Sequence, residues 1–354
     1  MTITFLFPNS GSQLSGGLKV VCEYANRLAT DGHNVNIAYA GSIFWSNKTW
    51  FYKMTGIVRF LRTWFMGYSC RNWFALDKRV KEHWCWSLNE RHVPQSDIYI
   101  CTSPYTAMYL KNYAVGRKFY LIQDYENWGN LTDIGLRETY HFPLHKIVIS
   151  HWLKAIMDEE KETCTIIPNG FHPEDFVLHT PISSKDKYYV TMLYHTMSRK
   201  DCTMGFRALD IVHEKYPQLH VNIFGTPERP STLPEWYNYY QQPDKQTLNR
   251  LYDQAGIFIG TSRVEGWGLT IGEAMLCGCA VACTDIPGYR EMATDNVTAL
   301  MSPVGDSNAM AANIIRLIED DALRCKIAEA GHQNIQQYTW DKSYAMLKKV
   351  LFKS

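Results

Sequence analysis

Apolar residues near the start of the chain come in alternating short and long blocks. A short apolar run at 3–7 is followed by a glycine- and serine-rich stretch at 9–17. Apolar residues at helical spacing then occupy 18–29, and a second short apolar run covers 35–40 after an Asp-Gly pair. This order predicts a strand, a loop, a helix and a second strand.

The same order of blocks returns in the second half of the chain. An apolar run, a polar loop, a helical pattern and another apolar run lie in turn at 189–193, 194–202, 203–215 and 219–224. Each half therefore opens like a parallel strand-helix-strand unit. We expect an α/β protein with two doubly wound, Rossmann-like domains that face a cleft at their strand ends.

A chain of 354 residues is too long for one ordinary hydrophobic core, which also favours two domains. The boundary is expected in the polar, proline-containing stretch at 165–186. The first domain then covers 1–167 and the second 168–339. The last segment, 340–354, has the pattern of an amphipathic helix that either completes the second domain or crosses back to the first.

Composition narrows the class of protein. Hydrophobic residues make up 46% and charged residues 20% of the chain, as in ordinary globular proteins. The net charge of +1 offers no general attraction to nucleic acid. The ten cysteines have irregular spacings, which argues against paired zinc ligands and favours a reduced, cytoplasmic protein. No stretch reaches the roughly 18 apolar residues of a membrane-spanning helix, and the start does not resemble a signal peptide.

The stretch SRVEGWGLTIGEAM carries two carboxylates, Glu265 and Glu273, with no residue of opposite charge between them. It follows a buried-strand pattern at 256–261, so its loop lies at the carboxyl end of a strand, where ligands bind in open α/β sheets. A helix is expected to begin near Leu269 and Thr270. The free amides at such a helix end favour an anion, typically a phosphate.

Glu265 precedes this helix, and Glu273 is expected in its first turn. Two carboxylates that accept hydrogen bonds from hydroxyl groups on either side of a diphosphate would suit a nucleotide sugar. Gly266 and Gly268 would let the backbone approach that ligand closely. The structural alternative is that Glu273 only compensates the helix dipole and that Glu265 is a solvated loop residue.

Two segments carry a family resemblance. The stretch SRVEGWGLTIGEAMLCGCAVACTDIPGYREM resembles the E-x7-E region of the retaining GT-B glycosyltransferases (family 4-like, glycosyl transferases group 1), and IIPNGFHPEDF resembles their inter-domain IPNG segment. The resemblance spans nearly the whole chain and is strongest over 257–305. It implies a GT-B fold and an enzyme that transfers a sugar, with retention of configuration, from a nucleotide-diphosphate donor to a hydroxyl of a glycan or lipid-linked glycan.

The resemblance also implies roles for individual residues. Glu265 would be a catalytic residue that positions the donor sugar and supports it electrostatically, and Glu273 would bind the ribose hydroxyls. The sugar and the diphosphate would be held by the backbone of Gly266, Trp267, Gly268, Leu269 and Thr270. No metal or other cofactor is implied.

The phosphate-binding loop of the family reads G-R-L-x-x-x-K-G, whereas this chain has YHTMSRKD. Lys200 falls on the lysine and would be a catalytic residue that stabilises the leaving diphosphate. His195 stands at the arginine position, and both glycines are absent. Either Arg199 compensates for the missing arginine or His195 donates a hydrogen bond.

Two further candidates lie in the first domain. Gly16 and Gly17 would bring backbone amides near the diphosphate, or they form only a strand-to-helix turn. A strand expected at 119–122 would place Asp124, in the segment QDYE, at its carboxyl end. This segment resembles some bacterial rhamnosyltransferases, and Asp124 would then be a catalytic-site residue that contacts donor or acceptor. Its acidic pair could instead hold a metal in the other glycosyltransferase architecture, which the downstream motifs disfavour.

The segment 43–76 is basic and aromatic, and the whole of 32–76 contains no Asp or Glu. Its cations are Lys48, Lys53, Arg59, Arg62 and Arg71, and its aromatic residues include Trp45, Trp50, Phe51, Tyr52, Phe60, Trp64, Phe65, Tyr68, Trp73 and Phe74. Such a segment suits the headgroup region of an anionic membrane or a lipid-linked acceptor. The alternative is an aromatic helical insertion packed on the first domain. Nucleic acid is not an expected partner, because the rest of the chain offers no basic face.

The habit of the family suggests surface polysaccharide or lipopolysaccharide assembly, with the protein peripheral on the inner face of the cell membrane. Two other functions stay open. Nucleotide-sugar 2-epimerases share the architecture but need acid/base residues near the sugar in place of an acceptor channel. A catalytically silent nucleotide-sugar-binding partner would fit the departure at His195. The E-x7-E spacing and the IPNG segment favour the transferase.

Overall fold

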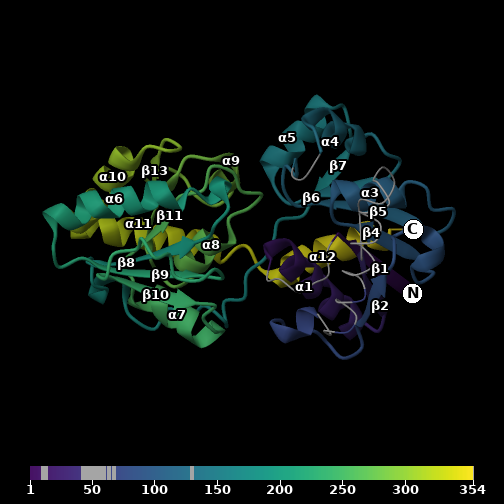
Figure 1. Ribbon diagram of the computed structural model, residues 1–354, viewed down its shortest axis with the longest axis horizontal. Helices are drawn as coiled ribbons and strands as arrows, with labels where there is room; N and C mark the ends of the chain where they lie inside the picture. Colours follow the sequence, from purple (N-terminus) through teal and green to yellow (C-terminus); the bar gives the residue numbers. More distant parts are fainter. Residues whose placement is uncertain (9–14, 41–60, 62–64, 66–68, 128–130, 354) are drawn as a thin grey trace. The chain divides into compact units, whose positions relative to one another are not determined.

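The computed structural model describes residues 1–8, 15–40, 61, 65, 69–127 and 131–353. Contacts between residues divide the chain into two compact units, each built on its own parallel sheet (Figure 1). Unit 1 comprises Met1–Asn169 and Asp341–Ser354, and unit 2 comprises Gly170–Trp340. Each unit alternates strands and helices, which is the α/β arrangement that the alternating apolar blocks predict.

The sheet of unit 1 has, in the described part of the chain, the strand order β3-β2-β1-β4-β5-β6-β7, and all neighbours are parallel. The strands are β1 (Thr2–Phe7), β2 (Asn34–Ala40), β3 (Lys81–Cys85), β4 (Ile98–Cys101), β5 (Arg117–Ile122), β6 (His145–Val148) and β7 (Cys164–Ile166). In the described part of this unit, up to Asn169, the α-helices are α1 (Gly16–Thr30), α3 (Pro104–Leu110), α4 (Asp133–Tyr140) and α5 (His151–Glu159), and short 3-10 helices lie at Cys70–Asn72 (η1) and Glu90–His92 (η2).

The sheet of unit 2 has the order β10-β9-β8-β11-β12-β13 and is also parallel throughout. Its strands are β8 (Tyr189–Tyr194), β9 (His220–Gly225), β10 (Tyr237–Gln241), β11 (Ile257–Gly260), β12 (Ala280–Thr284) and β13 (Leu300–Ser302). Its helices are η3 (Ile182–Ser184), η4 (Ser198–Lys200), α6 (Cys202–Lys215), α7 (Lys245–Gln254), α8 (Leu269–Leu276), α9 (Pro287–Arg290), α10 (Ser307–Glu319) and α11 (Asp321–Ile335).

Burial explains why the central strands read as continuous apolar runs. Strands β11 and β12 are buried at every position, and they contribute Ile257, Ile259, Ala280 and Ala282 to the core of unit 2. A parallel strand covered by helices on both faces has no solvent-facing side, so it shows no alternation of apolar and polar residues. The strands predicted from such runs are therefore confirmed, with ends shifted by the turns that flank them.

The strand order of unit 2 places one pair of loops together. The chain runs from β8 outward through β9 to β10 and then returns to β11 on the other side of β8. Strands β8 and β11 are therefore parallel neighbours at the point where the order reverses, with Ile257 opposite Val190. Crevices for ligands form at the carboxyl ends of strands at such a reversal.

The final helix, α12 (Trp340–Leu351), crosses back to unit 1 and lies beside α1 there (Figure 1). The Tyr344 hydroxyl donates to Asp31 at 2.8 Å, and the Lys348 ammonium donates to the same carboxylate at 3.0 Å. The guanidinium of Arg117 donates to the Leu351 carbonyl at the end of the helix. The sequence left open whether this segment completes the second domain or crosses back to the first, and these contacts show that it crosses back.

The first and the last residues of unit 2 lie next to each other. The amide of Phe171 donates to the Tyr338 carbonyl at 3.0 Å, and Phe171 pairs with Thr339 in a parallel bridge. A Cβ atom on Gly170 would lie 2.2 Å from the backbone nitrogen of Trp340, so no larger residue fits there. The glycine of the IPNG segment is thus required by the close approach of two backbones.

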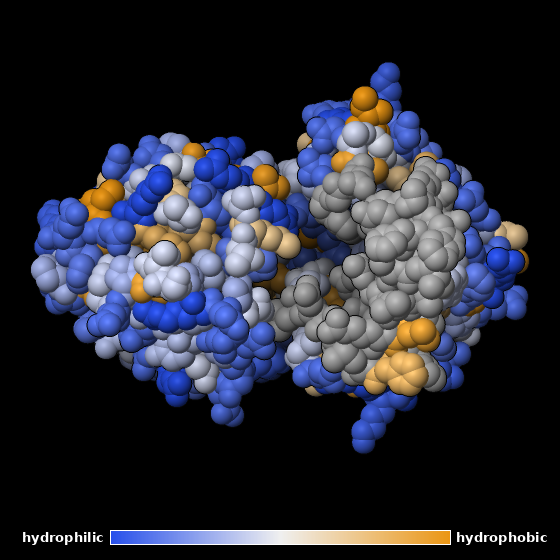
Figure 2. All heavy atoms as spheres, viewed as in Figure 1, coloured by the Kyte–Doolittle hydropathy of each residue, from blue (hydrophilic) through white to orange (hydrophobic). Residues whose placement is uncertain are grey.

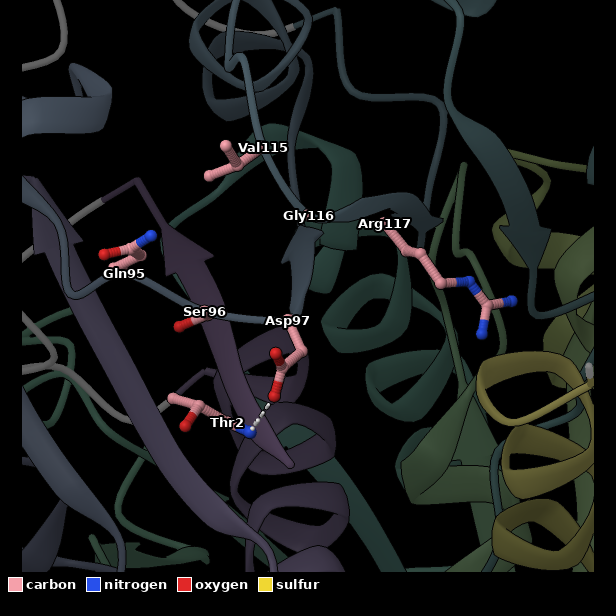
Figure 3. A pocket seen from close by; sticks show the side chains of 7 residues that line it. All are labelled: Thr2, Gln95, Ser96, Asp97, Val115, Gly116 and Arg117. Atoms are coloured by element: carbon pink, nitrogen blue, oxygen red, sulfur yellow. Dashed lines mark hydrogen bonds between the residues drawn. The ribbon is translucent and has the colours of Figure 1, made fainter.

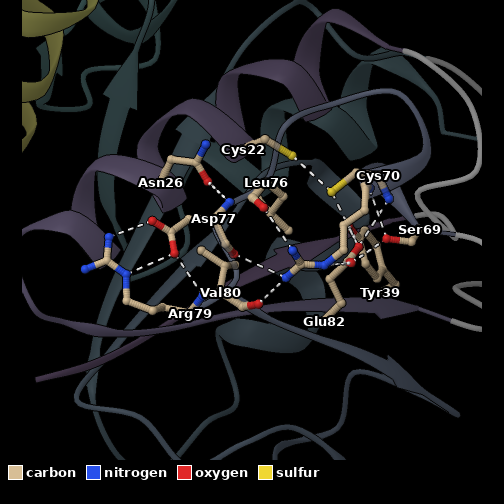
Figure 4. A network of polar contacts seen from close by, with 11 residues as sticks. Cys22, Asn26, Tyr39, Ser69, Cys70, Leu76, Asp77, Arg79, Val80 and Glu82 are labelled. Atoms are coloured by element: carbon tan, nitrogen blue, oxygen red, sulfur yellow. Dashed lines mark hydrogen bonds and ion pairs between the residues drawn. The ribbon is translucent and has the colours of Figure 1, made fainter.

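Glu82 on β3 anchors the described end of the basic, aromatic segment to the sheet of unit 1 (Figure 4). Its carboxylate accepts hydrogen bonds from the hydroxyls of Tyr39 and Ser69 and from the amide of Cys70, and it pairs with Arg71 at 3.2 Å. Most of 43–76 lies outside the described residues, so the predicted membrane or acceptor contact of this segment stays a prediction.

The surface of the coloured residues in Figure 2 is mostly hydrophilic, and apolar side chains appear on it in small groups. Scattered apolar residues of this kind are normal on a folded protein. Among the residues that the structure describes, no helix is both long and apolar enough to cross a membrane.

Candidate functional site

The loops that follow β8 and β11 are tied together by hydrogen bonds at the carboxyl edge of the unit 2 sheet. The hydroxyl of Thr261 donates to the Lys200 carbonyl at 2.7 Å. The amide of Arg263 donates to the Arg199 carbonyl, also at 2.7 Å. Two predicted site segments that are far apart in the sequence, YHTMSRKD and SRVEGWG, therefore form one surface.

Lys200 and Glu265 meet on this surface. The Lys200 ammonium pairs with the Glu265 carboxylate, and the side chains are only 17% and 12% exposed. The hydroxyl of Ser262 donates to the same Glu265 oxygen at 2.6 Å. A partly buried cation, a carboxylate and a hydroxyl in contact can bind an anionic group and sugar hydroxyls side by side.

The backbone after Glu265 leads directly into α8. Gly268 has a φ of 101°, a left-handed conformation that glycine adopts without steric cost, and α8 begins at the next residue as predicted. A Cβ atom on Gly268 would lie 2.6 Å from the Tyr289 ring. Trp267 is buried and packs edge-on against Tyr338, with ring centroids 5.3 Å apart. These contacts fix the loop that leads into α8, whose first amides lie at the carboxyl edge of the unit 2 sheet.

Glu273 does not lie in the first turn of α8, contrary to the prediction. It is the fifth residue of Leu269–Leu276, and the first turn contains no acidic residue. Its side chain is buried, and the Tyr252 hydroxyl of α7 donates to it at 3.3 Å. Because the helix dipole acts mainly within the first turn, simple dipole compensation does not account for a buried carboxylate at this position.

The loop after β8 lacks the last glycine of the family pattern, and the backbone conformation of Asp201 shows how the chain accommodates this change. Asp201 stands where the pattern has its last glycine, and its φ of 44° and ψ of 42° lie in the left-handed region. Its carboxylate pairs with Arg263 at 2.7 Å. Asp201 therefore adopts a conformation that glycine takes without steric cost, and its side chain adds a contact to the loop after β11.

His195 follows β8 directly and is half-buried. Its Nδ1 accepts a hydrogen bond from the Met197 amide at 3.0 Å. Burial lowers the pKa of the His195 ring, and the positive charges of Lys200 and Arg199 lower that pKa further. The ring is therefore neutral near pH 7.

The candidates of unit 1 form a second group. Gly16 and Gly17 are the first two residues of α1, which begins two residues earlier than the helical pattern predicts. The Gln123 amide donates to the Gly17 carbonyl at 3.4 Å, so the turn before α1 and the QDYE segment after β5 are neighbours. Asp124 accepts a hydrogen bond from the Tyr125 amide at 2.9 Å. The structure places these residues at the carboxyl edge of the unit 1 sheet.

Four residues of the unit 2 site had no predicted role. Ser262 and Arg263 lie inside the quoted motif, and Asp201 ends the departing loop, so their positions could have been noticed from the sequence. Tyr252 gave no signal, because a tyrosine in a helical pattern reads as an ordinary core residue. Among the residues described, no group of three or more His, Cys, Asp or Glu side chains is arranged to hold a metal ion.

A hollow of about 600 Å³ lies elsewhere, at the amino ends of β1, β4 and β5 in unit 1 (Figure 3). Asp97 in this hollow accepts the Thr2 amide at 2.7 Å, and Arg117 points toward α12. Its polar groups thus bind neighbouring parts of the chain. Because ligands of such sheets bind at the carboxyl edge, we assign this hollow a structural character.

Comparison with known proteins agrees with this arrangement. Residues 180–334 match the family model described as glycosyl transferases group 1. A phosphatidyl-myo-inositol mannosyltransferase of Mycolicibacterium smegmatis is 24% identical over 194 residues, which cover 52% of this chain and 50% of that protein. O-antigen chain mannosyltransferase B of Escherichia coli is 31% identical over 106 residues, or 30% of this chain and 27% of that protein. The chain thus spans about half the length of the mannosyltransferase from Mycolicibacterium, and less of the second relative.

Solved structures share the fold over the full length. Sucrose-phosphate synthase from Thermosynechococcus elongatus superposes with a TM-score of 0.72 at 14% identity and covers 99% of this chain and 98% of its own. Anabaena HepE, crystallised with UDP and glucose, superposes with a TM-score of 0.73 at 14% identity and 99% coverage of both chains. Identities this low establish the fold alone. Residues 180–334 thus form a glycosyl transferases group 1 domain, and the two parallel α/β sheets give the chain a GT-B fold.

Proposed function

We propose that the protein is a retaining glycosyltransferase that moves a sugar from a nucleotide-diphosphate donor to a hydroxyl of a glycan or lipid-linked glycan. The observation that carries this proposal is the meeting of Lys200, Glu265 and the amino end of α8 at one edge of the unit 2 sheet. A cation beside free helix amides suits a diphosphate, and a carboxylate beside them suits sugar hydroxyls.

In this structure Lys200 and Glu265 form an ion pair with each other. The donor would place its diphosphate against the Lys200 ammonium and the amides of 266–270, and its sugar hydroxyls would donate to the Glu265 carboxylate. Glu273, which is buried and held by Tyr252, would bind the ribose hydroxyls. Gly16, Gly17 and Asp124 of unit 1 would contact the diphosphate or the acceptor.

As the bond between the anomeric carbon and the diphosphate oxygen breaks, negative charge grows on the leaving oxygen. Lys200 and the amides of α8 would stabilise that charge. The leaving phosphate then accepts the proton of the acceptor hydroxyl, whose oxygen attacks from the same face, so the anomeric configuration is kept. Glu265 positions the sugar in this scheme and forms no covalent bond to it.

The names of the relatives support a glycan or lipid-linked acceptor, since they include a phosphatidyl-myo-inositol mannosyltransferase and an O-antigen chain mannosyltransferase. We propose surface polysaccharide assembly as the setting, with 43–76 as a peripheral contact to an anionic membrane. The donor sugar is a hexose or a deoxyhexose such as rhamnose. We further propose that transfer needs no metal ion, so that a chelator leaves the rate unchanged.

The test is a thermal-shift panel of nucleoside diphosphates and nucleotide sugars, because a ligand that binds only the folded state raises its stability. We expect one base to raise the melting temperature and Glu273→Ala to abolish that rise. Glu214→Ala, an exposed glutamate on α6, is the matched control and should keep it. No rise with any compound would contradict the donor site.

Turnover of the donor that binds then separates the functions. Sugar transfer to an acceptor with the anomeric configuration retained supports the proposal, and inversion would contradict the retaining scheme. An isomerised donor without transfer would indicate a 2-epimerase. Binding without either reaction, over a panel of lipid-linked and polysaccharide acceptors, would indicate a nucleotide-sugar-binding partner.

A further inference from the structure

The ring of His195 is held in one orientation by its own loop. The Met197 amide donates to Nδ1 at 3.0 Å, and the His195 amide donates to the Cys202 sulfur at 3.3 Å. A nitrogen that accepts a hydrogen bond carries no proton, so the proton of the neutral ring lies on Nε2. Protonation of Nδ1 would break the bond to Met197.

The groups around the ring also oppose a positive charge there. Arg199 and Lys200 of η4 are cations, and the Cys202 thiol of α6 is kept neutral because burial raises its pKa. Glu265, in the loop after β11, acts in the opposite direction and favours the protonated ring. Since Glu265 is already paired with Lys200, the cations and the burial of the ring prevail.

We propose that His195 binds the donor diphosphate as a neutral donor through Nε2–H, in place of the charged guanidinium that the family carries at this position. The proposal rests on the glycosyltransferase function above. It favours His195 over Arg199 in the choice that the sequence left open, because the Met197 contact fixes one ring N–H on the loop that also carries Lys200.

A neutral N–H at position 195 can stabilise a phosphate oxygen by a hydrogen bond but adds no net charge, so the positive charge of this loop comes from Arg199 and Lys200. A hydrogen bond to a charged group contributes roughly 1.5–3 kcal/mol, which corresponds to about 10- to 150-fold in affinity.

The first experiment measures the tautomer in the intact protein. Histidine labelled with nitrogen-15 reports in NMR which ring nitrogen carries the proton, and His195→Ala identifies the signal of this residue. We expect a neutral Nε2–H ring at pH 7 in the ligand-free protein. A proton on Nδ1, or on both nitrogens, would overturn the proposal, and this measurement on the unmodified chain does not depend on a variant that folds.

The second experiment measures affinity for the nucleotide sugar selected by the donor panel, whose diphosphate does not itself titrate between pH 6 and 8.5. We expect His195→Ala to weaken binding about tenfold or more. His195→Gln, whose amide nitrogen can occupy the place of Nε2, should bind within about threefold of the original. His195→Asn carries the same amide one carbon shorter, at the place of Nδ1, and should resemble the alanine variant.

The pH dependence distinguishes a neutral from a charged ring. For a neutral donor, the ratio of the affinities of the unmodified protein and His195→Ala stays constant across this pH range. A ratio that falls toward one as pH rises would assign the contact to the imidazolium and overturn the proposal, as would equal binding by both proteins. If the unmodified protein binds no donor, the proposed function fails, whereas the tautomer measurement stands apart from it.

Discussion

Asp201 serves both the backbone and the side-chain contacts of the candidate site. Its left-handed conformation is one that glycine adopts freely and that Asp tolerates better than most residues. Its carboxylate makes no capping hydrogen bond to α6 and pairs with Arg263 instead. One residue thus replaces a glycine of the family pattern and joins the loops after β8 and β11.

Substitution of Asp201 tests the backbone part of this account. Asp201→Gly and Asp201→Ala both remove the ion pair with Arg263, so the difference between them isolates the conformational term. We expect the glycine variant to be more stable by about 1 kcal/mol, because an L residue in the left-handed region costs roughly 1–2 kcal/mol. Urea denaturation of the two variants measures this difference. Equal stabilities would show that the residue is not left-handed in solution.

At the scale of elements, a buried lysine caps the carboxyl end of α7, the helix whose Tyr252 donates a hydrogen bond to Glu273. The ammonium of Lys185 is buried and donates to the carbonyls of Tyr252, Asp253 and Ala255, at the carboxyl end of α7. The last carbonyls of a helix have no partner within it, and a cation there also suits the negative end of the helix dipole. Tyr252, which donates to Glu273, is therefore positioned by a residue outside the site.

Replacement of Lys185 should lower the free energy of unfolding more than the same replacement of an exposed lysine. Lys185→Met keeps much of the buried volume but removes the ammonium from the carbonyls of Asp253 and Ala255, whereas the Tyr252 carbonyl keeps the Ala255 amide as a donor. We expect a loss of about 2–3 kcal/mol in the free energy of unfolding. Lys187→Met is the control, because Lys187 makes a single ion pair with the exposed Asp321. That change should cost less than about 1 kcal/mol. Similar losses in urea denaturation would contradict the capping role.

At the scale of the whole molecule, the chain leaves unit 1 after Asn169 and re-enters it at Asp341. The returning helix buries Leu347 and Leu351 in unit 1 and ends against Arg117. One of its links to α1 is the Asp31 carboxylate, whose pKa is lowered chiefly by the hydrogen bonds from Lys348 and Tyr344. The attachment of the last helix therefore depends in part on the charge of a residue near the beginning of the chain.

The sign of the pH effect follows from that lowered pKa. Asp31 has a lower pKa in the folded than in the unfolded chain, where it is about 3.9. Its contribution is fully present above that value and is lost as pH falls through the folded-state pKa. Because the pair is partly exposed, we expect Asp31→Asn to cost about 1 kcal/mol or less at pH 7.

The pH dependence of this contribution can be measured by thermal unfolding. Asp31→Asn and the unmodified protein are compared at pH 7 and well below pH 4. The difference between the two proteins should shrink at the acidic pH, where the carboxyl group is protonated in both folded and unfolded chains. Asp341→Asn is the control, since its carboxylate pairs with Arg27 but is 88% exposed. A difference for Asp31→Asn that persists at acidic pH would contradict the account.

Local sequence patterns were sufficient to predict many of the strands and helices of this protein. The apolar runs and helical spacings predicted β1, α1 and β2 in unit 1 and β8, α6 and β9 in unit 2, because each depends on residues close in sequence. The start of α8 at Leu269 followed from the glycines before it. Glu265 was a candidate from its place after a buried-strand pattern, and Lys200 from motif resemblance; neither argument carries information about the distance between them.

Contacts between distant parts of the chain decided the rest. The Lys200–Glu265 pair spans 65 residues, and it forms because β8 and β11 become neighbours when the strand order reverses. The support of Glu273 by Tyr252 and the return of α12 to Asp31 arise in the same way. A local pattern records which face of an element is apolar, but not which other element will cover it, since that choice depends on the packing of the whole unit.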